Sequence, residues 1–207
     1  MLSNDHKNPF KLLWDYLIFL KVPKAIINQK ANMKGDTYMD FQILDMAGAY
    51  IEHSTIITNF VAITYSQLRN SVCRVFPDNV QYKWTLKDGT EKIVIPDASI
   101  NCRVHAKRGN SFFDISRFVM EVLSPSTEKY DRTEKMEIYR KQEIDEYWIV
   151  DWKAKKVEIY TLDYDESGEP QYYLFETITE ENKDKLKIVH FPSIKITFDE
   201  LFDIEFK

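Results

Sequence analysis

The chain has 207 residues, of which 44% are hydrophobic and 29% are charged, and its formal net charge is −5. These values fit one soluble globular domain with a sizeable core. The low number of glycines, five, argues against a linker-rich or low-complexity chain. The negative charge excludes a general attraction to nucleic acid, so such binding would need a local basic patch.

The first candidate element is the segment FKLLWDYLIFLKV, residues 10–22. It contains charged residues, falls short of the roughly 20 apolar residues that span a bilayer, and is not followed by a small-residue cleavage site. We predict a helix that Asn8 and Pro9 begin and that packs on the core or a second subunit, with weak membrane-surface association as the alternative. Its apolar face predicts a homodimer and comprises Phe10, Leu13, Trp14, Leu17 and Leu20.

We divide the chain into a helical extension, residues 1–35, and a main domain, residues 36–207. In the main domain, TYMDFQIL (37–44) is typical of a strand, and a helix is expected from Glu52 to Arg69. The apolar stripe of this helix consists of Ile57, Phe60, Val61, Thr64 and Leu68.

Several strands are expected next: CRVF (73–76), VQYKWTL (80–86), EKIVI (91–95) and PDASINC (96–102). The Asp-Gly pair between Lys87 and Thr90 predicts a hairpin, and Pro96 requires a sheet edge, a bulge or the start of a strand. RVHAKRGNS (103–111) is expected to form a loop, and RFVMEVL (117–123) to form the central buried strand.

A helix should follow, capped by Asp131 with Glu134 three residues later and ending near Gln142. Four strands are then predicted, EYWIV (146–150), KVEIYTL (156–162), YYLFETI (172–178) and LKIVHF (186–191), before a closing turn at FDELF (198–202). The passage from strand 117–123 through the helix to strand 146–150 indicates a βαβ unit. We therefore predict an α/β (α+β) layer fold with a β-sheet flanked by helices.

Cys73 and Cys102 are the two cysteines of the chain. They lack the CxxC or Cys/His spacing of a zinc site, and a reduced compartment is the default for cysteines without a pairing signal. We predict that both are unpaired, buried packing residues and that the protein is cytoplasmic.

Glu121 is the one carboxylate within the apolar run of residues 118–123, and a buried carboxylate must be paired, hydrogen-bonded or bound to a metal. Asp97 stands at the start of another strand. If the two strands are neighbours, the carboxylates converge and a hard cation, Mg²⁺ or Mn²⁺, would neutralise them. The alternatives are a turn residue for Asp97 and a structural ion pair with Lys135 or Arg103 for Glu121.

Five motifs, MAGAYIEH, CRVF, IPDASINC, VMEVLSPSTEKYDRTEK and EYWIVD, resemble the Uma-two family of restriction-endonuclease-like proteins within the PD-(D/E)XK nuclease superfamily. The resemblance extends from about Tyr38 to Phe202. It implies a mixed sheet flanked by helices and a Mg²⁺-dependent or Mn²⁺-dependent endonuclease acting on DNA. It also implies that Asp97, Glu121 and the Val122 carbonyl are metal ligands.

The superfamily usually carries a lysine two residues after the glutamate, where this chain has Leu123. In the Uma-two pattern the lysine stands on the following helix, at Lys135, to act on the attacking water or on phosphate charge. A cation in the first turns of a helix opposes the macrodipole, so local structure offers no reason for Lys135. Position 42 lacks the acidic residue common in the family, and Glu52 beside His53 is the candidate substitute.

The remaining candidates keep two interpretations each. Asp131 is a helix cap or a catalytic residue, Tyr139 belongs to the core or supports the site, and His53 is structural or a base. Four basic residues form either a solvent-exposed face or contacts to the phosphate groups of a nucleic acid: Lys129, Arg132, Arg140 and Lys141.

The alternative to an endonuclease is a catalytically inactive protein of the same fold that binds nucleic acid or another partner. Leu123 and the negative net charge favour this alternative, whereas Asp97, Glu121 and Lys135 favour the enzyme. A metal-free glycosidase is a third possibility, but the strands do not place aromatic platforms for sugars.

Overall fold

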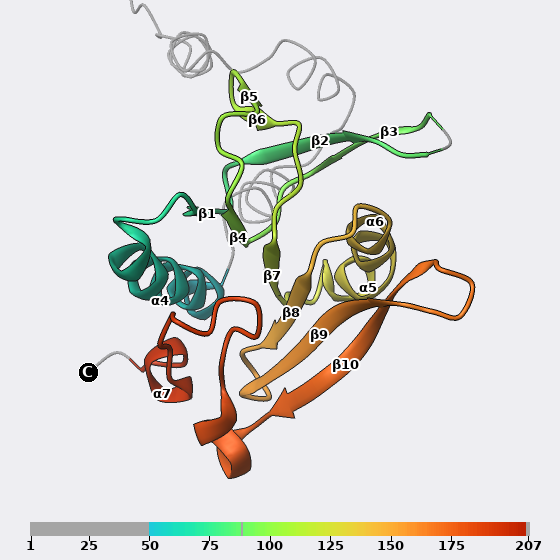
Figure 1. Cartoon of the computed structure of the whole chain (residues 1–207). Coiled ribbons are helices and arrows are strands. Elements are labelled where there is room, and N and C mark those ends of the chain that lie inside the picture. The colour runs from blue at the N-terminus through green and yellow to red at the C-terminus, as the bar shows by residue number, and fades with distance from the viewer. Residues whose placement is uncertain (1–49, 88, 206–207) are drawn as a thin grey trace, which may run out of the picture. The chain divides into compact units, whose positions relative to one another are not determined.

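The computed structural model describes residues 50–87 and 89–205. In this part a six-stranded and a four-stranded sheet are flanked by helices, which confirms the predicted mixed α+β fold (Figure 1). The predicted N-terminal helix, the strand at 37–44 and the 35/36 boundary lie outside the described residues. Among the described residues, no helix combines the length and apolarity needed to cross a bilayer.

The larger sheet has the strand order β1-β4-β7-β8-β9-β10. Its parallel pair is β7 with β8, and all other neighbours are antiparallel. The strands are β1 Arg74–Pro77, β4 Ala98–Asn101, β7 Phe118–Val122, β8 Glu146–Asp151, β9 Lys156–Tyr164 and β10 Pro170–Ile178. As predicted, β7 is the buried strand, since all of its residues are buried.

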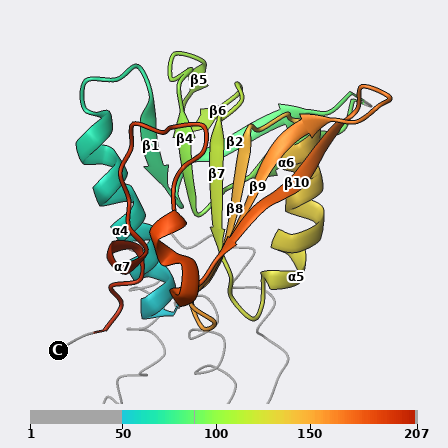
Figure 2. The ribbon, with the colours of Figure 1, turned by 60° about the horizontal axis from the view of Figure 1, so that its bottom comes forward.

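The connection from β7 to β8 is helical and has three parts, α5 Glu128–Tyr130, the π-helical turn η1 Asp131–Lys135 and α6 Met136–Lys141. It confirms the predicted βαβ unit (Figure 2). The helix begins four residues earlier than a cap at Asp131 predicts, and the capping role of Asp131 is wrong. The Asp131 amide already donates a 2.9 Å hydrogen bond to the Thr127 carbonyl, so this residue lies inside the helix.

Two hydrophobic clusters cover the faces of the larger sheet. α4 (Ile51–Leu68), close to its predicted bounds, packs with α7 (Phe198–Leu201) against the face that carries Phe118, Met120 and Val122. α6 and the smaller sheet pack against the face that carries Val119 and Leu123. Because side chains alternate along a strand, Glu121 is directed to this second face.

The smaller sheet has the order β3-β2-β6-β5 and contains β2 Gln81–Thr85, β3 Glu91–Val94, β5 Lys107–Arg108 and β6 Ser111–Phe112. The predicted hairpin joins β2 and β3, and Gly89 adopts a φ of +83°, which glycine tolerates without steric cost. The prediction of a loop throughout residues 103–111 is wrong, because β5 and β6 form there. Strands of two residues are too short to show an alternating pattern.

The predicted strand at 186–191 is also wrong, because turns replace it. The amides of Val189 and His190 donate hydrogen bonds of 3.0 and 2.8 Å to the buried carboxylate of Glu146. A side chain on β8 thus takes the donors that a sheet ladder would need. The 3₁₀ segment η2 (Glu180–Lys185) precedes these turns.

The prediction of unpaired cysteines is wrong, since Cys73 and Cys102 form a disulfide. β1 and β4 pair in the register Arg74 to Asn101, so the next position along the ladder sets the two cysteines opposite each other. The pairing depends on strands that are distant in sequence. The compartment inferred from unpaired cysteines loses its basis.

Candidate active site

Asp97 and Glu121 meet beside the junction of β4 and β7. Asp97 directly precedes β4, and the antiparallel register of Ala98 with Met120 sets it opposite Glu121. The Asp97 amide donates a long hydrogen bond of 3.4 Å to Glu121 Oε2, and the Val122 amide donates one of 2.7 Å to Asp97 Oδ2. The structure therefore brings together the two carboxylates whose strand positions suggested convergence.

The Glu121 carboxyl group is completely buried. Tyr139 donates a 2.6 Å hydrogen bond to its Oε1, and Lys135 donates one of 2.8 Å to its Oε2. Burial raises the pKa of Glu121 to about 8, against the attraction of Lys135, and the nearby Asp97 and Asp131 also raise it. The ionised form of Glu121 therefore needs more positive charge than Lys135 alone provides.

Lys135 is the last residue of η1, and single π-helical turns often mark functional sites. Its Nζ lies 2.8 Å from Glu121 Oε2 and 3.0 Å from Asp131 Oδ1. Burial lowers the pKa of Lys135, but these two carboxylates outweigh burial and raise it above its usual value. Since the helix begins at Glu128, Lys135 lies about two turns inside it, and the macrodipole does not act against it there.

Asp131 is buried, and its carboxylate is the second one that contacts the Lys135 ammonium group. Its backbone carbonyl accepts a 2.9 Å hydrogen bond from the Tyr147 hydroxyl. This geometry makes Asp131 a positioning residue for Lys135. Arg103 does not pair with Glu121, because its guanidinium lies 2.8 Å from Asp114.

His53 reaches the site from the first turn of α4. Its Nε2 lies 3.2 Å from Asp97 Oδ2, whereas its buried Nδ1 has no hydrogen-bond partner among the described residues. Burial lowers the pKa of His53, but Asp97 more than compensates, so that the pKa is raised. In the described part of the chain, Glu52 makes no hydrogen bond or ion pair with this cluster.

Asp97 and Glu121 offer oxygen donors of the kind that a hard divalent cation prefers. Glu121 and Asp131 contact the Lys135 ammonium group, and Asp97 lies opposite Glu121 just before β4. Among the residues that the structure describes, no group of three or more His, Cys, Asp and Glu side chains is placed to hold a metal ion. Mg²⁺ commonly takes one or two carboxylates and completes its shell with water and phosphate oxygens, which suits this set.

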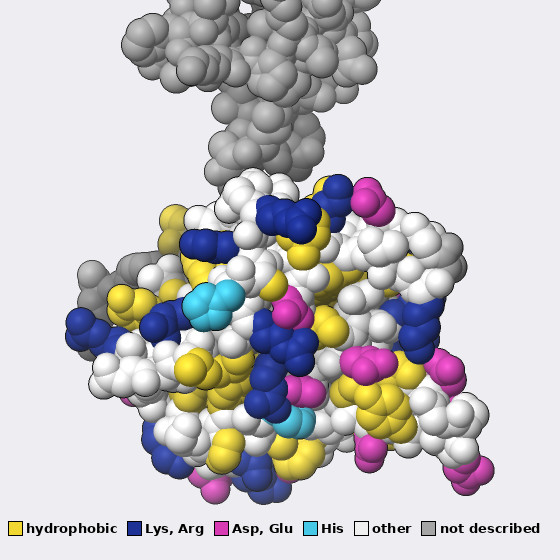
Figure 3. Space-filling model, turned by 45° about the horizontal axis from the view of Figure 1, so that its top comes forward, with side chains coloured by type: hydrophobic (Ala, Val, Ile, Leu, Met, Phe, Trp, Pro, Cys, Tyr) yellow, Lys and Arg dark blue, Asp and Glu magenta, His cyan; other side chains and the backbone are white. Residues whose placement is uncertain are grey.

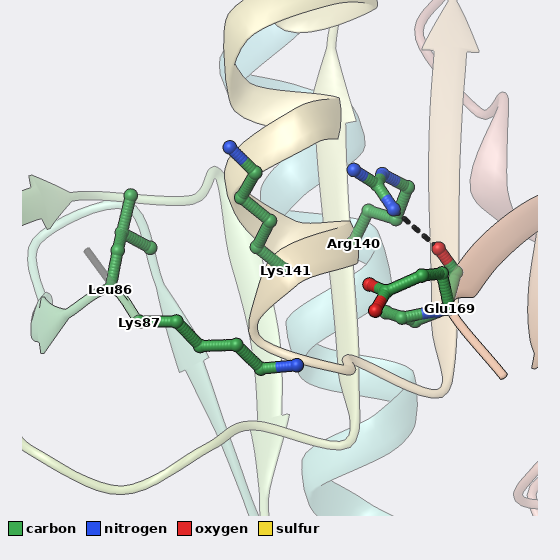
Figure 4. A pocket seen from close by; sticks show the side chains of 6 residues that line it. Leu86, Lys87, Arg140, Lys141 and Glu169 are labelled. Atoms are coloured by element: carbon green, nitrogen blue, oxygen red, sulfur yellow. Dashed lines mark hydrogen bonds between the residues drawn. The ribbon is translucent and has the colours of Figure 1, made fainter. Parts of the chain in front are cut away.

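Three of the four basic residues that flank the site form ion pairs, whereas Lys129 is exposed and forms none among the described residues. Arg132 contacts Glu128 and Glu158, and both Arg140 and Lys141 contact Glu137. A pocket of about 150 Å³ at the end of α6 includes Arg140, which also binds the Pro170 carbonyl (Figure 4).

On the face shown in Figure 3, basic side chains gather near the centre with acidic ones beside them. Positive charge in these regions is thus largely balanced within the protein.

The role of the Val122 carbonyl as a metal ligand stays a prediction, while the Val122 amide binds Asp97 Oδ2. Backbone groups leave no signature in a sequence, so this bond to Asp97 had no signal. The Tyr139 hydroxyl bond also depends on where α6 lies on β7. The spacing of four residues between Lys135 and Tyr139 was the available signal, since such residues share a helix face.

This chain is similar in sequence or fold to proteins already known. A curated relative, the uncharacterized protein slr1290 of Synechocystis sp., is 27% identical over 124 residues, which are 59% of this chain and 64% of that protein. The match thus spans less than two thirds of that relative. A crystal structure of "a putative nuclease belonging to DUF820" from Anabaena variabilis shares the fold, with a TM-score of 0.57 at 19% identity, over 74% of this chain and 81% of that one.

The family model of Uma2, described as "Putative restriction endonuclease", matches residues 37–193. This range is more than half of the chain and contains Asp97, Glu121 and Lys135. The match agrees with the geometry of the site and with the shared fold. The chain belongs to the Uma2 family.

Proposed function

We propose that this protein is a Mg²⁺-dependent or Mn²⁺-dependent endonuclease that hydrolyses phosphodiester bonds in DNA. The observation that carries the proposal is the cluster in which Asp97 lies opposite Glu121 and the Lys135 ammonium group binds the Glu121 carboxylate. The description of the family and the nuclease-like fold support the same class of reaction.

Asp97 and Glu121 would hold the cation, with the Val122 carbonyl as a further ligand. When bound, such a cation polarises a phosphate and lowers the pKa of a water molecule that it binds. His53 and the Val122 amide fix Asp97 Oδ2, while Tyr139 fixes Glu121 Oε1. Each carboxylate is thus oriented before a substrate arrives, and preorganised groups are the more effective ones.

Lys135 supplies positive charge and does not act as a base. Its pKa is raised by two carboxylates, so that the ammonium group remains protonated at neutral pH. We assign it to donate hydrogen bonds to the attacking water or to a phosphate oxygen, and so to stabilise charge that develops during the reaction.

The test is cleavage of supercoiled plasmid by the full chain with Mg²⁺ or Mn²⁺. Asp97→Asn and Glu121→Gln should abolish cleavage. The matched control is Lys155→Ala, which removes an exposed lysine paired with Glu205. Equal cleavage by the wild type and Glu121→Gln would show that a contaminating nuclease or another site is responsible.

A non-catalytic binding module is the second candidate, and Leu123 favours it. This residue, where the superfamily usually has its lysine, is buried in an apolar cluster. A protein that binds DNA or RNA yet cuts neither with any divalent ion would have this function.

A further inference from the structure

Another pocket adjoins the Asp97–Glu121 cluster. Its volume of about 490 Å³ is typical of a small-ligand site, and its lining comprises Leu123, Ser124, Pro125, Glu128, Asp151, Trp152, Lys153 and Ala154. Leu123 directly follows Val122, whose amide binds Asp97. The pocket therefore begins one residue from the proposed cleavage site.

Trp152 lines this pocket and stands in contact with the ring of Tyr50. The Trp152 indole N–H donates a 3.1 Å hydrogen bond to the Leu123 carbonyl, which fixes the ring against the end of β7. The ring centroids of Tyr50 and Trp152 are 5.4 Å apart, and Tyr50 is 49% exposed. Tyr50, the residue directly before α4, also precedes His53 by about one helical turn.

A lysine with no carboxylate partner lies over the aromatic pair. Lys153 Nζ is 5.3 Å from the ring centroids of both Tyr50 and Trp152, and within the described part of the chain it forms no ion pair. The two acidic residues of the pocket are engaged. Asp151 accepts hydrogen bonds from the amides of Lys153 and Ala154, and Glu128 pairs with Arg132. Lys153 is thus the basic residue of the lining, beside two carboxylates whose oxygens already accept hydrogen bonds.

We propose that this pocket binds an unpaired nucleobase, which stacks on the Trp152–Tyr50 pair while Lys153 contacts an adjoining phosphate. Aromatic rings combined with a cation are the usual means of holding single strands, because an unpaired base has a free π face. A base inside a duplex has both faces covered by its neighbours. The inference rests on the proposed function and narrows its substrate to nucleic acid with unpaired bases beside the cleaved bond.

The test separates binding from cleavage. Fluorescence anisotropy without divalent ions would compare a labelled short oligothymidylate with a duplex of equal length. The wild type should prefer the single strand, and Trp152→Ala should weaken single-strand binding by roughly 5- to 150-fold, the range reported for loss of one base-stacking ring. Lys153→Ala should reduce the salt dependence of binding, since one phosphate contact is lost.

Two variants control for structure. Trp152→Phe removes the hydrogen bond to Leu123 and keeps an aromatic face, so it should retain most of the affinity. Tyr164→Ala removes an exposed ring of β9, a strand that does not line the pocket, and should change nothing. If Trp152→Phe loses as much affinity as Trp152→Ala, the ring serves only to hold the loop and the proposal is wrong.

The two proposals fail in different ways. Cleavage of duplex DNA with no preference for the single strand, and unaffected by Trp152→Ala, overturns the base pocket and leaves the endonuclease intact. Trp152-dependent binding of the single strand, with no cleavage under any divalent ion, overturns the endonuclease and leaves the pocket as a binding site.

Discussion

Tyr139 donates a 2.6 Å hydrogen bond to Glu121, and both side chains are completely buried. This bond joins the helix that carries Lys135 to the strand that carries a proposed metal ligand. A buried acceptor that loses its donor is left with an uncompensated desolvation penalty. The bond should therefore affect both the free energy of unfolding and the orientation of Glu121.

Tyr139→Phe should lower the free energy of unfolding by about 1–3 kcal/mol, because Glu121 Oε1 loses its donor. It should also reduce the rise in melting temperature that Mg²⁺ produces. Tyr172→Phe is the matched control, since it removes a partly buried hydroxyl that binds the Ile144 carbonyl and not Glu121. Urea unfolding and thermal melts would measure both; equal metal responses in the two variants would contradict the prediction.

Mg²⁺ or Mn²⁺ should stabilise the wild type, by about 2.7 kcal/mol at a concentration of 100 times the dissociation constant. Glu121→Gln should abolish this stabilisation. Without metal the variant should be more stable than the wild type, because the raised pKa of Glu121 means that ionising it disfavours the fold. The pKa of Glu121 is about 8 in the folded state and about 4.5 in the unfolded state. The stability advantage of Glu121→Gln over the wild type should therefore grow as the pH rises from about 4.5 to 8. An unchanged metal response would place the metal elsewhere.

Lys135→Ala should lower the cleavage rate by roughly 10²- to 10³-fold, as expected for loss of one preorganised charge-stabilising group. Metal affinity should persist, because Asp97 and Glu121 are the proposed ligands. Single-turnover cleavage and metal titration would separate the two effects. Activity indifferent to this change would remove Lys135 from the mechanism.

Glu158 should govern part of the acid sensitivity of the fold. Despite burial, hydrogen bonds from Arg132, Lys156 and Tyr160 lower the pKa of Glu158 to about 2. The resulting stabilisation, roughly 3 kcal/mol at most, is present above the unfolded pKa of about 4.5 and lost as the pH falls toward 2. Melting temperatures between pH 3 and 6 should therefore fall less steeply in Glu158→Gln. Parallel curves for the two proteins would refute this.

The full chain should form a homodimer, because the apolar face of residues 10–20 is broader than one packed helix face needs. Light scattering across a concentration series measures the assembly. The double variant Trp14→Glu, Leu17→Glu places charges in this apolar face and should shift the full chain toward monomer. A wild type that is monomeric at working concentrations contradicts the prediction.

Local sequence patterns were sufficient to predict the elements with long or regular periodicity. The apolar stripe predicted α4, Asp-Gly predicted the β2–β3 hairpin, and the buried run around Glu121 predicted β7. The resemblance to a known family identified Asp97, Glu121 and Lys135 as the residues to inspect. These signals are local, because periodicity and turn chemistry act over a few residues.

Contacts between distant groups depend on how the elements pack together. The register of β1 with β4 placed Cys73 opposite Cys102, and the carboxylate of Glu146 on β8 took the amides of Val189 and His190 out of a strand. The π-helical turn placed Lys135 against Glu121 while Leu123 joined the core. Each of these outcomes depends on contacts between segments far apart in the chain, which no local pattern of residues encodes.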